Sequence, residues 1–106
     1  MADPGFRVAV KAVEGVVQVE LVGELDVATA PELQRRVDEI VGADGDVRAD
    51  CAELTFADSS GLDTLIRLAK ALRAQQRRLV LTNVRPMVRR AMDVLQIEEL
   101  FDLEET

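Results

Sequence analysis

The chain has 106 residues, a length that fits one domain with a single hydrophobic core. Its formal net charge is −7, and it contains one cysteine, no histidine and three phenylalanines as its only aromatic residues. This composition argues against nucleic-acid binding, which depends on cationic side chains, and against zinc sites, which need several cysteines or histidines.

The first predicted elements are two strands. Apolar and polar residues alternate in "FRVAVKAV" (6–13) and again in "VVQVELVG" (16–23). This period of two predicts strands that bury one face. Glu14 and Gly15 fit a tight turn between them, so we expect the chain to open with a β-hairpin.

A helix is predicted from "TAPEL" (29–33) to Gly42, which is a plausible stop signal. Thr29 is expected to cap this helix, with Glu32 completing a capping box, and Pro31 is tolerated in the first turn. The expected buried stripe consists of Leu33, Val37, Ile40 and Val41.

A third strand is predicted in "VRADCAEL" (47–54), although Arg48 and Asp50 interrupt its apolar residues. The remaining residues Val47, Ala49 and Cys51 share one face, as a half-buried strand requires. We interpret Cys51 as a small core residue rather than a redox sensor.

Helical spacing begins at Ser60 and continues to about residue 76, with apolar positions at Leu62, Leu65, Ile66, Ala69 and Leu72. Residues 56–60 are therefore expected to form the loop between the third strand and this helix. "RLVLTN" (78–83) then predicts a short strand, and "EELFDL" (98–103) a final strand or turn. Between them, "RPMVRRAMDVLQI" (85–97) predicts a helix that faces inward with Met87 or Val88, Met92 and Leu95.

Strands that alternate with helices predict an α/β fold with βαβ crossovers. We expect a single domain over residues 1–106, with a mixed sheet of four or five strands, an opening hairpin and three main helices.

The segment "ADSSGLDTLIRL" (57–68) places an acid, two hydroxyls and a glycine before the second helix. Such residues are common there for capping alone, and either Asp58 or a serine could cap. A helix N-terminus also tolerates an anion, so a phosphate on Ser59 could be accommodated without unfolding. The charge of this phosphate would repel a partner docked at the start of this helix. The residues by themselves favour the cap over the switch.

"GELD" (23–26) and "DSSGL" (58–62), in this order and spacing, resemble the STAS domain family, and within it the bacterial anti-sigma factor antagonists. The resemblance extends over essentially the whole chain. It implies that the unphosphorylated protein binds an anti-sigma factor that is also a serine kinase with a GHKL-type ATP site, which frees a sigma factor. Phosphorylation would then end this binding, and a PP2C-type phosphatase would reset it.

The resemblance also implies the site residues. Ser59 matches the phosphorylated serine, and the partner-binding residues are Asp26, Asp58, Ser59, Ser60, Gly61 and Asp63. Gly61 is expected to allow a close backbone approach. Asp63 departs from the usual pattern, since many such antagonists have glycine there; its carboxylate could approach the phosphate or point to solvent as a first-turn acid.

No enzymatic activity, cofactor or metal is expected, because P-loop and GxGxxG patterns are missing and Asp26 and Asp58 lack further carboxylates for Mg²⁺. The sequence has neither an apolar run long enough to cross a bilayer nor a signal peptide, which predicts a cytoplasmic protein without membrane insertion. Two alternatives remain. One is a docking module of a lipid ABC transporter or stressosome-like assembly without phosphorylation; the other is a sensor that holds a nucleotide phosphate at the helix N-terminus.

Overall fold

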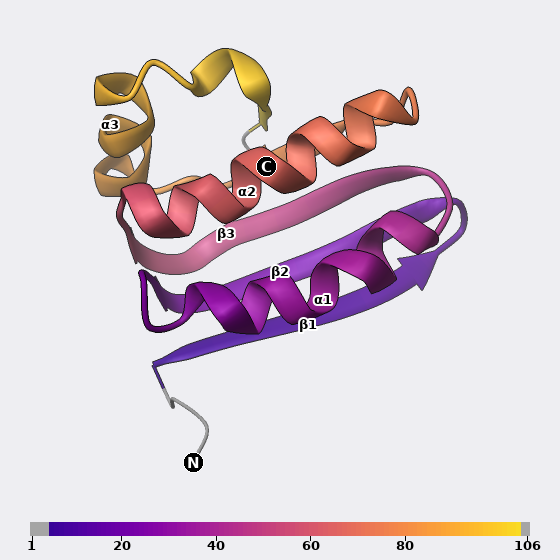
Figure 1. Ribbon diagram of the computed structural model, residues 1–106, viewed down its shortest axis with the longest axis horizontal. Helices are drawn as coiled ribbons and strands as arrows, with labels where there is room; N and C mark the ends of the chain where they lie inside the picture. Colours follow the sequence, from indigo (N-terminus) through magenta and orange to yellow (C-terminus); the bar gives the residue numbers. More distant parts are fainter. Residues whose placement is uncertain (1–4, 105–106) are drawn as a thin grey trace.

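The computed structural model describes residues 5–104 and shows one mixed sheet with helices packed on it (Figure 1). The strand order is β1-β2-β3-β4-β5; β1 and β2 are antiparallel, and each later pair is parallel. The strands are β1 (Phe6–Val13), β2 (Val16–Leu25), β3 (Asp46–Ala57), β4 (Leu79–Thr82) and β5 (Asp102–Glu104). The helices are α1 (Ala30–Gly42), α2 (Ser59–Ala74), α3 (Pro86–Val94) and the 3₁₀ turn η1 (Glu98–Leu100). The predicted α/β class, opening hairpin and three main helices are confirmed.

The hairpin turn has the geometry that its sequence predicts. Glu14 and Gly15 both have positive φ, 48° and 80°, as the tight turns that suit twisted antiparallel strands require. From this turn, β2 runs back along β1 with Val13 opposite Val16 and Phe6 opposite Gly23. The hairpin therefore forms one edge of the sheet and places β2 beside the central strand β3.

Helices α1 and α2 cover the same face of the sheet (Figure 1). Alternate residues of β2 and β3 are buried there, together with the apolar stripes of the two helices. The core residues from these four elements include Val17, Val19, Leu21, Val47, Ala49, Cys51, Leu33, Ile40, Leu62, Leu65 and Leu72. The predicted buried faces are thus correct for both strands and both helices, although Val37, Val41 and Ile66 are only partly buried.

The junction between β3 and α2 is shorter than predicted. β3 continues to Ala57, because Glu24 and Leu25 of β2 pair with Phe56 and Ala57 and extend the ladder to the start of the helix. The loop expected over residues 56–60 is therefore wrong, and Asp58 alone connects the strand to the helix.

The end of α3 also differs from the prediction. Val88 and Met92 are buried, but Leu95 is 43% exposed, so its predicted inward orientation is wrong. The helix ends at Val94, and the backbone turns at Gln96, which has a φ of 57°. After this turn, Ile97 is partly buried and packs against the core.

Arg77 connects the two helices at the amino edge of the parallel strands. Its guanidinium donates to the carbonyl oxygens of Ile40 and Val41, at 3.2 and 2.7 Å, and of Gly45, at 2.7 Å. These carbonyls belong to the end of α1 and the loop that follows it, where helical partners are missing. The Arg77 side chain, which lies next to β4, thereby supplies hydrogen-bond donors to the last carbonyl groups of α1.

Cys51 is fully buried on β3, as predicted for a core residue. Burial, with a smaller effect of Asp50, raises the pKa of its thiol to about 12. Because the thiolate is the reactive form, we expect native protein to resist iodoacetamide at pH 8 and to react after unfolding in guanidinium. Mass spectrometry of the two samples tests this, and equal labelling of both would contradict the burial of Cys51.

Candidate functional site

The pairing of β2 with β3 brings the two sequence motifs together. Leu25 is paired with Ala57, so the next residues, Asp26 and Asp58, leave the sheet from neighbouring strand ends. The backbone N–H of Asp58 donates to the carbonyl oxygen of Leu25 at 3.2 Å. Figure 1 shows both junctions at the same end of the sheet, beside the first turns of α1 and α2. The carboxyl ends of parallel strands are where such sites gather.

Asp58 caps α2. Its carboxylate Oδ1 accepts from the backbone N–H of Gly61 at 2.9 Å, and its carbonyl accepts from Leu62 at 2.8 Å. Of the two predicted capping residues, the acid rather than a serine therefore takes this role. The half-buried carboxylate satisfies one of the N–H groups that a helix start leaves unpaired.

Ser59 and Ser60 are the first two residues of α2, and both are exposed. Neither hydroxyl makes a hydrogen bond to another residue within 5–104. The fold does not use these hydroxyls, so they are accessible to a modifying enzyme or a partner. The helix N-terminus at which they lie favours negative charge.

Gly61 is buried where α2 crosses the end of β2. A Cβ atom at this position would lie 2.2 Å from the carbonyl oxygen of Leu25, much closer than real Cβ atoms approach backbone. The predicted close approach is therefore present, and it presses the first turn of α2 against the strand that leads to Asp26.

The start of α1 is stabilised differently from the prediction. The carboxylate Oδ1 of Asp26 accepts from the backbone N–H groups of Ala28 and Thr29, at 2.9 and 3.1 Å. The Thr29 hydroxyl makes no capping bond and instead donates to the carbonyl of Glu24 at 2.7 Å. The predicted capping box is thus wrong, because Thr29 is buried and directed back toward β2, and Glu32 forms an ion pair with Arg35 at 2.7 Å.

Asp63 lies one turn into α2. Its carboxylate forms a 2.7 Å ion pair with Arg67, four residues further along the helix. Both side chains remain largely exposed to solvent, so the pair contributes little to stability. Asp63 is therefore directed along the surface of α2 by Arg67.

A shallow groove runs between the first turns of α1 and α2. Its lining consists of Val27, Ala30, Pro31 and Gln34 on one side, and of Ser60, Asp63, Thr64 and Arg67 on the other. Sequence reasoning did not identify Val27, whose side chain is 73% exposed. The available signal was an apolar residue between the last acid of "GELD" and the start of a helix.

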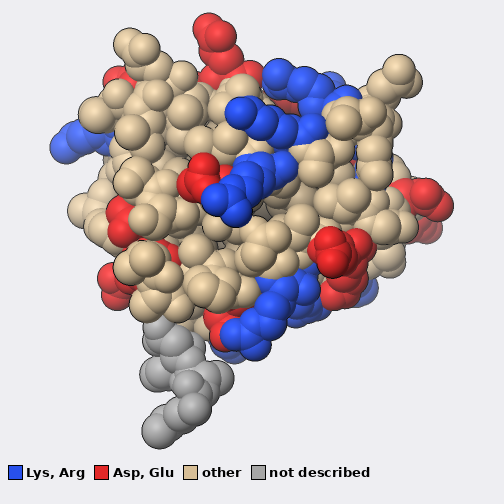
Figure 2. All heavy atoms as spheres, in the orientation of Figure 1, with Lys and Arg blue, Asp and Glu red and all other residues tan. Residues whose placement is uncertain are grey.

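The helix-covered face carries both acids and bases, and several Lys and Arg side chains lie close together from the centre to the upper right of the view (Figure 2). In the described part of the chain, no three side chains are grouped as metal ligands, and no helix has the length and apolar character of a membrane span.

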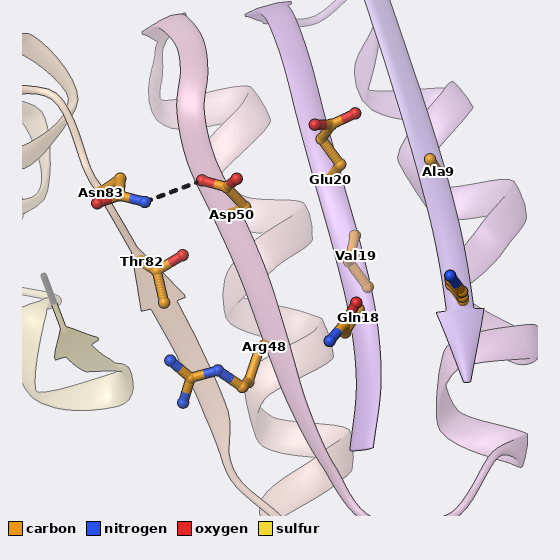
Figure 3. Close-up of a pocket in the computed structure, with 9 residues that line it drawn as sticks. Ala9, Gln18, Val19, Glu20, Arg48, Asp50, Thr82 and Asn83 are labelled. Atoms are coloured by element: carbon orange, nitrogen blue, oxygen red, sulfur yellow. Dashed lines mark hydrogen bonds between the residues drawn. The ribbon is translucent and has the colours of Figure 1, made fainter. Parts of the chain in front are cut away.

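A second hollow, of about 400 Å³, lies on the face of the sheet opposite α1 and α2 (Figure 3). Its polar side chains lie in two rows across the strands: Lys11, Gln18 and Arg48 form one row, and Glu20 and Asp50 form the other. Two of them already have partners: Arg48 pairs with Glu104 at 2.6 Å, and Asp50 accepts from the Asn83 amide at 3.3 Å. This hollow shares no residue with the corner at Asp26 and Asp58, which remains the candidate site.

Comparisons with known proteins agree with this architecture. A family model described as the STAS domain matches residues 7–106. The anti-sigma-B factor antagonist of Bacillus subtilis is 28% identical over 98 residues, which cover 92% of this chain and 90% of the relative.

Two solved proteins share the fold. An anti-sigma factor antagonist from Mycobacterium paratuberculosis superimposes with a TM-score of 0.82 and 25% identity, over 100% of this chain and 92% of the other. The Bacillus protein SpoIIAA matches in its unphosphorylated form with a TM-score of 0.78 and 20% identity, over 94% and 88% of the two chains. Its phosphorylated form gives 0.74 and 21%, over 94% and 91%.

Proposed function

The chain belongs to the STAS domain family, and we propose that it is an anti-sigma factor antagonist switched at Ser59. In this proposal the unphosphorylated form binds an anti-sigma factor with a GHKL-type serine kinase fold in the cytoplasm, and a sigma factor is released. Phosphorylation of Ser59 ends the binding, and a PP2C-type phosphatase restores it. The protein itself catalyses no reaction.

One observation carries the proposal: Ser59 is an exposed hydroxyl that the fold does not use, directly after the capping Asp58 and beside the loop that begins at Asp26. The B. subtilis relative, matched over nearly its whole length, is an anti-sigma-B factor antagonist. The phosphorylated and unphosphorylated forms of SpoIIAA both have this fold. This supports the proposal that a phosphate on Ser59 would leave the fold intact.

The proposed switch acts through charge. A phosphate adds about −1.5 to −2 charges, and its oxygens can accept from the N–H groups of the first turn of α2. The same charge stands next to Asp58 on the docking surface, so a partner meets repulsion and a desolvation cost. A penalty of about 1.4 kcal/mol weakens binding tenfold.

Ser59→Asp is therefore expected to lose the partner, while Ser59→Ala binds it and resists phosphorylation. Tagged wild type, both variants and Gln18→Glu are used to capture proteins from the native host, which are identified by mass spectrometry. Gln18→Glu adds one charge on the opposite face of the sheet and should capture as wild type does.

Recovery of a small GHKL-type kinase by wild type and Ser59→Ala, but not by Ser59→Asp, is the expected result. Recovery of lipid-transporter or scaffold subunits by wild type and Ser59→Asp alike would replace the switch with a docking module. In that case the serines would serve only as the first residues of α2.

A further inference from the structure

We propose that Val27 is the apolar anchor of the docking site, and that Asp26 is a positioning residue that holds Val27 in place. This inference rests on the proposed function, because the occupant is the same anti-sigma factor. It changes the role of Asp26, which the resemblance assigns to the partner surface, from direct contact to support of a neighbour.

Val27 differs from the other exposed apolar residues in its location. Four large apolar side chains are exposed within residues 5–104, and three of them, Met87, Val94 and Leu95, belong to α3 or its end. Val27, at 73% exposure, lies between Asp26 and the start of α1. A single exposed valine is ordinary on a protein surface. Its position at the candidate site makes it available for apolar contact with the partner.

The groove around Val27 has the composition of a protein interface. Val27, Ala30 and Pro31 supply apolar surface on the α1 side, while Asp63 and Arg67 supply charges on the α2 side. Interfaces of this kind combine an apolar centre with a polar rim, and a few well-packed side chains at the centre carry most of the binding energy.

The loop that carries Val27 is fixed from both sides. The Asp26 carboxylate accepts from the N–H groups of Ala28 and Thr29, which are the next two residues after Val27. The Thr29 hydroxyl donates to the Glu24 carbonyl at 2.7 Å and accepts from the Asp26 N–H at 2.9 Å. A loop whose backbone is already ordered loses less conformational entropy on binding, which increases affinity. Asp26 thus contributes by fixing this loop.

Charge indicates what the occupant presents to the groove. Asp63 lines the groove, Asp58 is two residues before the groove residue Ser60, and the cation Arg67 is already paired with Asp63 at 2.7 Å. The complementary surface is an apolar side chain flanked by lysine or arginine. A phosphate on Ser59, the neighbour of the groove residue Ser60, would add negative charge where this apolar contact must exclude water. Phosphorylation would therefore weaken the apolar contact at Val27 and also add to the negative charge of the nearby acids.

The test uses the anti-sigma factor captured by wild type, purified, and titrated by calorimetry with full-length variants. Val27→Ala is expected to bind at least tenfold more weakly, and Val94→Ala, which truncates an equally exposed valine on α3, within twofold of wild type. Asp26→Ala should lose at least tenfold. Asp26→Asn, which keeps the Oδ1 acceptor and removes the charge, should bind within about twofold of wild type.

Thermal melts establish that each variant is folded, and the outcomes separate the two proposals. Wild-type affinity of Val27→Ala, or equal losses for Asp26→Asn and Asp26→Ala, would overturn the inference. If Ser59→Asp still lost the partner, the proposed function would stand. If wild type captured no anti-sigma factor, both proposals would fail together.

Discussion

Replacement of Gly61 by alanine is expected to lower the free energy of unfolding by about 3 kcal/mol, the upper part of the usual range for overpacking a core. The added Cβ would lie 2.2 Å from the carbonyl oxygen and 2.7 Å from the carbonyl carbon of Leu25. That carbonyl cannot swing away freely, because it accepts the N–H of Asp58 and its residue pairs with Ala57. Helix α2 must move instead, and the corner at Asp26 and Asp58 would separate.

Urea denaturation followed by circular dichroism measures this loss. Gly42→Ala is the matched control, since a Cβ there meets nothing within 4 Å, and alanine favours a helix by up to about 1 kcal/mol. Gly61→Ala should also bind the partner more weakly than wild type under conditions where it remains folded. A Gly61→Ala variant as stable as wild type would mean that α2 and β2 are less closely packed than described.

Arg77→Ala is expected to cost about 2 kcal/mol of stability, because groups left without a hydrogen-bond partner typically cost about 1–3 kcal/mol. The guanidinium bonds three carbonyl oxygens, of Ile40, Val41 and Gly45, and alanine provides no replacement. Arg77→Lys should recover only part of the loss, because one ammonium group cannot reproduce the planar fork of donors.

The same urea titration tests Arg77→Ala against Arg90→Ala, which removes an exposed arginine from α3. The expected result is a lower transition midpoint for Arg77→Ala alone. An equal change in both variants would point to net charge rather than to the end of α1. Partner binding should be retained, since Arg77 lies at the edge of the sheet opposite Asp26.

Patterns with a clear period predicted most of the fold. Alternation gave β1 and β2 their correct faces, and the helical spacing from Leu62 to Leu72 identified the buried side of α2. These patterns succeed because a buried face requires an apolar residue at every second position of a strand, or at every third or fourth position of a helix. The extension of β3 to Ala57 was not visible in the apolar periodicity, because it depends on pairing with Glu24 and Leu25.

The start of α1 shows why local motifs can mislead. A threonine followed three residues later by a glutamate has the sequence of a capping box. Burial of Thr29 directs its hydroxyl to the Glu24 carbonyl, so the N–H of Glu32 donates to the Thr29 carbonyl instead. Asp26 accepts the N–H of Thr29, which the Glu32 side chain would accept in a capping box. This hydrogen-bond pattern depends on tertiary packing, so the motif at residues 29–32 alone could not predict it.

The candidate site was predicted through a family resemblance rather than through spacing. Nothing in the separation of Asp26 from Asp58 places them side by side; the parallel register of β2 and β3 does so. The resemblance also left Val27 out, because it transfers only residues that match a motif. Its exposure and the groove around it, which arise only in the folded chain, bring Val27 into the site.

The one-residue connection between β3 and α2 restricts how this chain can change in length. Each residue inserted at Asp58 would rotate α2 by about 100°, turning Gly61 away from Leu25 and Ser59 away from the edge of the sheet. A deletion would rotate the helix equally far in the opposite sense. Insertions and deletions among related sequences are therefore expected to avoid this junction, however freely the other loops vary in length.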